Sequence, residues 1–229
     1  MENYLVVECK GLLFDMDGVL ISSIASADRC WVKWAKHYGV PNAESFQIKH
    51  GTRAVEIMKT ARPDFTEAQL AEGLVLIEDM EIADVADLKV LPGVREMLGM
   101  LPKERWTIVT SATRRLLLGR LKAARLPYPE ELITANEVVN GKPHPEPYRK
   151  GAALLGFASA QCVVVEDAPS GVGAGVAAGS PVLGVLGTHT AEQLYGAGAT
   201  WVVRDLAGVA VVSGENGLSL EFEAVSGRA

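Results

Sequence analysis

Two aspartates separated by one residue follow an apolar run near the start of the chain, in the segment FDMDGVL, where they are Asp15 and Asp17. Side chains at positions i and i+2 of an extended strand point to the same side, so both carboxylates would face one way. One carboxylate can attack an electrophilic centre, and the other can carry a proton. Aspartate is also common in turns, so the pair alone leaves a structural role open.

Three later segments place polar groups after, or between, apolar runs. WTIVTSAT contains Thr110 and Ser111, NGKPHPEPY contains Lys142, and CVVVEDAPSG contains Glu166 and Asp167. A hydroxyl and the backbone N–H groups that follow it can donate to phosphoryl oxygens, and a lysine followed by prolines that restrict the backbone could supply a fixed positive charge. Two acids at the end of a buried strand require a cation. Each signal is weak alone, but the four in this order indicate one site.

The elements that must position these groups are short apolar runs separated by longer segments compatible with helices. The runs are GLLF, WTIVT, CVVVE, PVLGVL and TWVV. Such alternation predicts βαβ units and a parallel sheet. Continuous apolar runs are typical of parallel strands that are buried on both faces. Because ligand sites in open parallel sheets lie beyond the carboxyl ends of the strands, an α/β fold would gather the four polar groups at one edge.

Residues 22–89 have a different character, without valine-rich runs and with apolar residues at helical spacing around Trp31 and Trp34. Within them, Thr66 is a suitable N-cap for a long helix in TEAQLAEGLVLIEDMEIADVADL. We therefore expect a helical insertion at 22–89 and a core made of residues 1–21 and 90–229. Pro92 is predicted at the first position of the helix that resumes the core.

The composition and net charge of the chain disfavour polyanionic partners. The 229 residues are 48% hydrophobic and 22% charged, with a formal net charge of −6 and a pI near 5.3. This balance disfavours nucleic acid and anionic membrane surfaces as partners. The start MENYLVVECK lacks the features of a secretory signal, and no apolar run is long enough to span a bilayer. We expect a cytoplasmic protein, monomeric by default, whose partner is a small molecule.

The order Asp-x-Asp, Ser, Lys and Glu-Asp resembles the haloacid dehalogenase-like (HAD) superfamily, with FDMDGVL, VTSAT, GKPHPEPY and VVVEDAPSG as its four motifs. The segments HGTRAVE, TSATR and ITANEVVNGKPHPEPY look most like the 2-deoxyglucose-6-phosphatase and glycerol phosphatase group. The resemblance implies a Rossmann-like core with an inserted α-helical cap domain. It also implies a Mg²⁺-dependent phosphatase for a small sugar or polyol phosphate, acting through an aspartyl-phosphate intermediate.

On this resemblance, Asp15 is the expected nucleophile and Asp17 the residue that protonates the leaving alkoxide and later activates water. Mg²⁺ would be held by Asp15, Asp167 and the backbone carbonyl of Asp17, with Glu166 acting through water or a neighbouring contact. The remaining expected groups bind the phosphoryl oxygens and comprise Ser111, the backbone N–H of Ala112, and Lys142.

Substrate selectivity is expected from the helical insertion and the mouth of the site. His50 and Arg53 lie in HGTR, and Arg114 follows Ser111 closely enough to reach the same mouth. Arg53 could bind a substrate oxygen through its guanidinium fork. The competing interpretations are a surface salt bridge for Arg53, local packing for His50 and a position on a helix surface for Arg114.

Four other activities were weighed against the phosphatase. Dehalogenases and phosphonate-cleaving relatives depart from the Asp-x-Asp pair, which is intact here. β-Phosphoglucomutases share all four motifs but carry a histidine on the first cap helix, where an ungapped comparison through Trp31 places Ala27. A non-catalytic binding module is the remaining alternative, since folds are reused for unrelated functions. Ala27 disfavours the mutase, and the filled catalytic positions disfavour the binding module.

Overall fold

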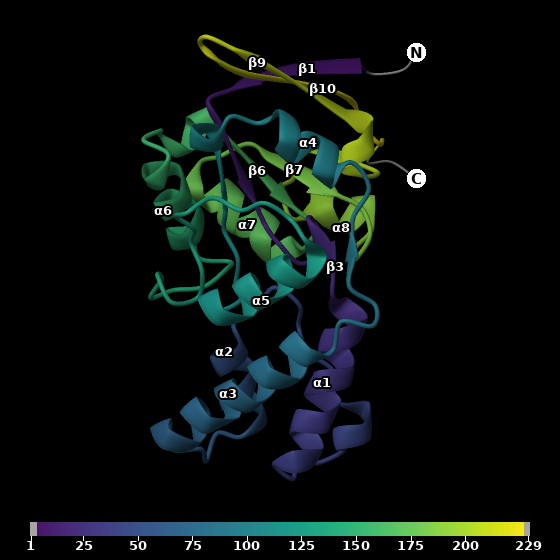
Figure 1. The fold of residues 1–229 in the computed structure, drawn as a ribbon, viewed down its shortest axis with the longest axis vertical. Helices are drawn as coiled ribbons and strands as arrows, with labels where there is room; N and C mark the ends of the chain where they lie inside the picture. Colours follow the sequence, from purple (N-terminus) through teal and green to yellow (C-terminus); the bar gives the residue numbers. More distant parts are fainter. Residues whose placement is uncertain (1–3, 227–229) are drawn as a thin grey trace.

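The structure, a computed structural model, describes residues 4–226 and has two parts stacked along its long axis (Figure 1). The centre is a five-stranded parallel sheet in the order β5-β2-β6-β7-β8. Its strands are β2 (Gly11–Phe14), β5 (Trp106–Ile108), β6 (Cys162–Glu166), β7 (Val182–Val185) and β8 (Trp201–Val203). These are the five runs predicted to be strands, which confirms the α/β fold with a parallel sheet.

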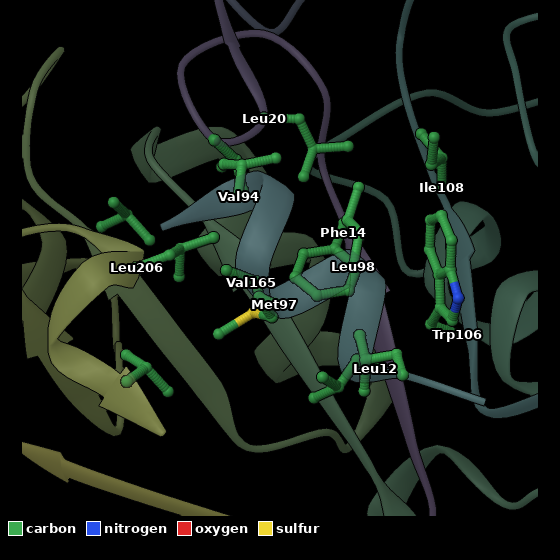
Figure 2. Close-up of a cluster of buried hydrophobic side chains, with 14 of the residues drawn as sticks. Leu12, Phe14, Leu20, Val94, Met97, Leu98, Trp106, Ile108, Val165 and Leu206 are labelled. Atoms are coloured by element: carbon green, nitrogen blue, oxygen red, sulfur yellow. The ribbon is translucent and has the colours of Figure 1, made fainter. Parts of the chain in front are cut away.

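Helices cover both faces of this sheet, because successive side chains of each strand point to opposite faces. Leu12 and Phe14 of β2 pack with α4 (Val94–Met100) and α5 (Arg114–Ala124), as Figure 2 shows for the α4 side. Leu13 points to the other face, which is covered by α6 (Glu146–Leu154), α7 (Pro169–Ala178) and α8 (Ala191–Gly196). Both faces being buried explains the unbroken apolar runs.

A helical segment lies between the two short strands β3 (Ile21–Ser22) and β4 (Lys89–Val90), which pair antiparallel. It contains α1 (Ile24–His37), the 3₁₀ turn η1 (Ala43–Ser45), α2 (Ala54–Ala61) and α3 (Glu67–Ala83). Thr66 caps α3 with Gln69 in a capping box, as predicted. Gly73 in the middle of α3 lets Trp34 approach, since the Trp34 indole N–H donates to the Gly73 carbonyl at 3.1 Å. The segment therefore has a core of its own.

The start of α4 corrects one prediction. The helix begins at Val94 with Gly93 as its N-cap, so Pro92 precedes the helix instead of occupying its first position. Gly93 has φ +79°, and a Cβ there would lie 2.1 Å from the backbone N of Ala207. The tight contact with the turn η4 (Leu206–Gly208) therefore requires a glycine with positive φ between the proline and the helix.

A second sheet escaped the sequence analysis. Strands β1 (Tyr4–Cys9), β10 (Gly217–Glu223) and β9 (Val209–Gly214) form a three-stranded antiparallel sheet at the end of the molecule opposite α1–α3 (Figure 1). Apolar side chains alternate along β10, where Leu218, Leu220 and Phe222 are buried. Two residues, Glu215 and Asn216, join β9 to β10. The remaining elements are the 3₁₀ turns η2 (Lys103–Arg105) and η3 (Ser159–Gln161).

Within residues 4–226, no helix has the length and apolar character needed to cross a membrane. The three cysteines, Cys9, Cys30 and Cys162, are free and buried.

Replacing Phe222 tests whether the second sheet belongs to the core. Phe222 is fully buried and packs edge-on against Trp201, so Phe222→Ala should lower the free energy of unfolding by about 3–5 kcal/mol. Val212 on β9 is 54% exposed, so Val212→Ala should change it by less than about 0.5 kcal/mol. Urea unfolding followed by circular dichroism measures both. Equal, small losses would show that the hairpin contributes little to the core.

Candidate active site

The predicted polar groups meet where β5, β2 and β6 end side by side. The backbone N–H of Asp15 donates to the carbonyl of Val165 at 3.0 Å, so the parallel register continues past the end of β2. On the other side, the N–H of Val109 donates to the Phe14 carbonyl at 2.8 Å. These contacts place Asp15 between Thr110, which follows β5, and Glu166 at the end of β6.

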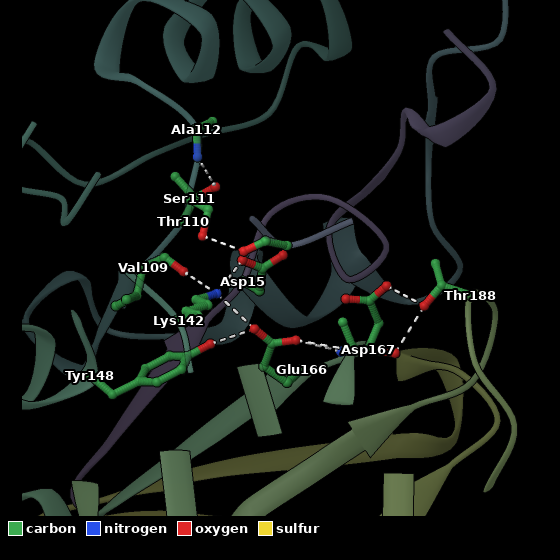
Figure 3. A network of polar contacts seen from close by, with 12 residues as sticks. Asp15, Val109, Thr110, Ser111, Ala112, Lys142, Tyr148, Glu166, Asp167 and Thr188 are labelled. Carbon is green, nitrogen blue, oxygen red and sulfur yellow. Dashed lines mark hydrogen bonds and ion pairs between the residues drawn. The ribbon is translucent and has the colours of Figure 1, made fainter. Parts of the chain in front are cut away.

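Lys142 lies at the centre of the group with its side chain only 1% exposed. Its ammonium donates to Asp15 Oδ1 at 2.5 Å, Glu166 Oε1 at 2.6 Å and the Val109 carbonyl at 3.0 Å, as Figure 3 shows. Three acceptors match its three protons. Burial alone would lower the pKa of Lys142, but Asp15 and Glu166 raise it above its usual range. Lys142 is therefore a charged residue inside the core.

Glu166 is a buried carboxylate with every oxygen engaged. Oε1 accepts from Lys142 and from the Tyr148 hydroxyl at 2.8 Å, while Oε2 accepts from the backbone N–H groups of Asp167 and Ala168 at 2.9 and 3.1 Å. A Cβ on Gly171 would fall 1.6 Å from Oε1, so glycine is needed there to admit this side chain. Tyr148 had no assigned role in the sequence analysis, although it ends the segment GKPHPEPY.

Asp167 completes an acidic cluster. One oxygen from each of Asp15, Glu166 and Asp167 lies within 4.8 Å of the other two, a spacing that could hold a metal ion. Thr188 contacts the Asp167 carboxylate and its carbonyl oxygen, the latter at 2.9 Å. Burial and the neighbouring carboxylates of Glu166 and Asp15 raise the pKa of Asp167 well above its usual range. The cluster thus carries more negative charge than Lys142 alone balances.

Asp17 faces a different set of partners. Its Oδ1 accepts from Arg120 Nη1 at 2.8 Å and from the Ser23 hydroxyl. Arg120 is buried on α5, and its Nη2 donates to Glu81 Oε2 on α3 at 3.1 Å. Arg120 was missed by the sequence analysis, because it lies 103 positions from Asp17 and has no motif around it.

Two of the three groups expected to bind phosphoryl oxygens, Ser111 and Ala112, line a cavity between the sheet edge and the helical segment, and the third, Lys142, lies outside this lining. Here the Ser111 hydroxyl donates to the carbonyl of Gly51 at 2.7 Å, and the Ala112 N–H donates to Thr110 Oγ1 at 3.1 Å. The cavity also contains Asp15, Asp17, Glu166 and Asp167 in its lining. It therefore joins the acidic cluster to the helical segment.

Of the three residues expected to contact substrate outside the core motifs, only His50 lines this cavity. Its Nε2 lies 3.2 Å from Asp28 Oδ1. The Arg53 guanidinium is occupied by Glu56 and by the Val139 carbonyl at 2.9 Å, so its contact with substrate stays a prediction. The same holds for Arg114, whose side chain lies against Glu137 at 3.4 Å. Both arginines are held by local partners outside the cavity lining.

Comparison with known proteins gives a consistent result. A family model described as haloacid dehalogenase-like hydrolase matches residues 9–179. Hexitol phosphatase A of Escherichia coli K12 is 40% identical, covering 78% of this chain and 84% of that one. The 2-deoxyglucose-6-phosphate phosphatase 1 of Saccharomyces cerevisiae is 32% identical, covering 91% and 93%. A solved structure from Bacteroides vulgatus, provisionally described as a β-phosphoglucomutase, is 28% identical with a TM-score of 0.74, covering 88% and 86%.

The buried acids predict how stability depends on pH without metal. Burial raises the pKa of Asp15 to about 7, with Lys142 opposing, so the folded state binds more protons than the unfolded state between about pH 4 and pH 7. The free energy of unfolding in EDTA should therefore fall from pH 5 to pH 7.5, as urea unfolding can measure. Asp15→Asn should reduce this slope without removing it, because Asp167 and Glu81 also have raised pKa values. A free energy of unfolding that rises over this range would contradict the assignment.

Proposed function

The chain belongs to the haloacid dehalogenase-like hydrolases, and from this membership we propose a Mg²⁺-dependent phosphatase that hydrolyses a small sugar or polyol phosphate monoester through a phosphoaspartate at Asp15. The observation that carries the proposal is the placement of Asp15. Its carboxylate accepts a hydrogen bond from the buried Lys142, and the residue also lines the cavity between the sheet edge and the helical segment.

The cluster fits a divalent cation of the Mg²⁺ type. Three carboxylates and one ammonium leave two negative charges uncompensated, which one divalent ion would balance. Oxygen ligands are those that Mg²⁺ prefers. We assign Asp15, Asp167 and the backbone carbonyl of Asp17 as its ligands, with Glu166 holding Lys142 and the loop at Asp167 in place. When bound, Mg²⁺ supplies screening of the negative charge on the phosphoryl group.

Asp15 is suited to attack because Lys142 stabilises its ionised form against the cost of burial. An Asp15 oxygen attacks phosphorus and the ester oxygen leaves, giving an acyl phosphate that water then opens. Lys142 stays bonded to Asp15, and its positive charge offsets the negative charge that develops on the phosphoryl oxygens. The hydrogen bond to Glu166 holds the Lys142 ammonium in place during both steps.

Asp17 is assigned the proton transfers. Both of its contacts, from Arg120 and Ser23, fall on Oδ1, so we assign the mobile proton to Oδ2. In the first step, Oδ2 gives its proton to the leaving alkoxide, and in the second it takes one from the attacking water. Arg120 fixes the orientation of the carboxylate for both steps.

The phosphoryl oxygens are assigned to Ser111, the Ala112 N–H and Lys142. The Ser111 hydroxyl has one hydrogen, which it donates to Gly51 in this structure. Donation to a phosphoryl oxygen therefore requires it to release Gly51, a residue of the helical segment. We infer that substrate binding and the position of this segment are linked, as in lids that close over a site.

The proposed domain boundaries follow the two parts of the structure. We propose that residues 22–89 form a cap domain and that residues 1–21 and 90–229 form the core domain. The cap would bind the leaving group, in line with relatives that are named for phosphates of hexitols and of 2-deoxyglucose. A monomeric state and a cytoplasmic location stay predictions from the sequence.

A mutase is the second candidate, since one structural neighbour is provisionally described as a β-phosphoglucomutase. Ala27 weighs against it. This residue is 7% exposed and lines the cavity on α1, at the position where the mutases carry a histidine. A methyl group cannot exchange a proton with a sugar hydroxyl, so hydrolysis is favoured.

Following phosphate and isomer formation together tests the proposal. With Mg²⁺, the protein should release inorganic phosphate from glucitol 6-phosphate or 2-deoxyglucose 6-phosphate. With β-glucose 1-phosphate it should form no glucose 6-phosphate. Isomer formation without phosphate release would identify a mutase, and neither product across a broad panel would favour a binding module.

The same assay includes a matched pair of aspartate variants. Asp15→Asn should abolish phosphate release, since its amide oxygen is a poor nucleophile. Asp79→Asn should behave as the wild type, because Asp79 is exposed on α3 and lies outside the cavity lining. Turnover by a correctly folded Asp15→Asn variant would remove the assigned nucleophile.

A further inference from the structure

The cavity has a second pair of carboxylates, which belongs to the helical segment. Glu78 and Glu81 lie three positions apart on α3, so they share one face of the helix. They are 6% and 5% exposed, and both line the cavity that also contains Asp15 and Ser111. Acids this deeply buried on a helix need partners or a function.

Resting on the proposed function, we propose that Glu78 and Glu81 form the subsite that binds hydroxyl groups of the substrate, so that the enzyme selects neutral polyhydroxy phosphates and rejects those with a second anionic group. The cap would then select the leaving group by its charge as well as by its shape.

Arginines of α5, which packs beside α3 (Figure 1), hold both acids from behind. Arg115 Nη1 donates to Glu78 Oε2 at 3.0 Å, and Arg120 Nη2 donates to Glu81 Oε2 at 3.1 Å. Neither arginine lines the cavity. The guanidinium groups thus offset the burial of the acids while the carboxylates form the cavity wall.

The carboxylates have hydrogen-bonding capacity to spare. Thr113 donates to Glu78 Oε1, which with Arg115 makes two donors for a group that can accept about four hydrogen bonds. Hydroxyls that donate to a carboxylate form stronger hydrogen bonds than those between neutral groups. The apolar side chains beside them, Trp31 and Ile77, can cover the C–H surface of a sugar chain.

A second anionic group on the substrate would meet the opposite conditions. Placing like charges together in a binding site costs several kcal/mol. The two arginines that offset the acids, Arg115 and Arg120, lie outside the cavity lining. The cations within the lining are Lys49, which is exposed, and His50, which lies 3.2 Å from Asp28. Discrimination would therefore come from repulsion as well as from attraction.

A pair of ligands that differ only at the far end of the chain tests this proposal. Glucitol 6-phosphate and 6-phosphogluconate share a six-carbon chain and differ in a CH₂OH group against a carboxylate at C1. Their dissociation constants are measured by calorimetry with Mg²⁺ on Asp15→Asn, which should not turn them over. Burial raises the pKa of Glu81 to about 7, so the titrations are run at pH 8.

In this background, 6-phosphogluconate should bind at least about 50-fold more weakly than glucitol 6-phosphate. Adding Glu78→Gln, which keeps the volume and removes the charge, should reduce that ratio at least about tenfold, and Glu81→Gln should act in the same direction. Asp79→Asn also removes a partner of Arg115 from α3 but does not touch the cavity, so the ratio should not change.

Equal binding of the two ligands by the Asp15→Asn protein would overturn the proposal. An unchanged ratio in Glu78→Gln would also overturn it, provided that thermal unfolding shows this variant to be folded. Glu78→Gln is the safer variant if Glu81→Gln does not fold, because the partner of Glu78, Arg115, is half exposed and tolerates the loss of the ion pair. Selective binding together with no hydrolysis of either compound by the wild type would support the subsite and contradict the proposed phosphatase, so the two failures are distinguishable.

Discussion

The buried ammonium of Lys142 between Asp15 and Glu166 is the contact on which the rest of the site depends. Breaking a buried ion pair by removing one partner costs about 3–5 kcal/mol, because the other charge is left uncompensated. Here one cation faces three carboxylates, so the shortage of positive charge is built into the fold. Burial, together with the neighbouring carboxylates, keeps the pKa values of Asp15 and Asp167 high, and the cluster could hold a metal ion.

A second line of charges links this cluster to the helical segment. Glu81 on α3 contacts Arg120 on α5, and Arg120 contacts Asp17, the residue to which we assign the proton transfers. Movement of α3 would therefore reach Asp17 through two ion pairs. In our account the leaving group is bound by the same helix that, through Arg120, orients the acid that protonates it. Selectivity and chemistry would share one set of contacts.

The sequence was most informative about the polar groups at the ends of the parallel strands. Apolar runs followed by polar groups sufficed to place Asp15, Ser111 and Glu166 together, because parallel strands end at a common edge. Contacts made by side chains on helices could not be predicted from the sequence in this way. Arg120, Tyr148 and Glu78 lie on helices, where a polar residue usually faces solvent, and their partners are distant along the chain. Arg53 and Arg114 are the opposite case: the sequence suggested a contact with substrate, but in the structure nearby acids and carbonyls hold both side chains outside the cavity lining.

The β9–β10 hairpin did have a signal in the sequence, the alternation of apolar and polar residues in GLSLEFE, but it is weaker than the continuous apolar runs of the central sheet.

Trapping the covalent intermediate tests the nucleophile most directly. Borohydride added during turnover with Mg²⁺ and a sugar phosphate reduces an acyl phosphate to the alcohol with release of phosphate, which converts an aspartate to homoserine. The account predicts homoserine at position 15, found by peptide mass spectrometry, only when substrate is present. Phosphate release at the normal rate with residue 15 unmodified, or with reduction at another acidic residue, would contradict it.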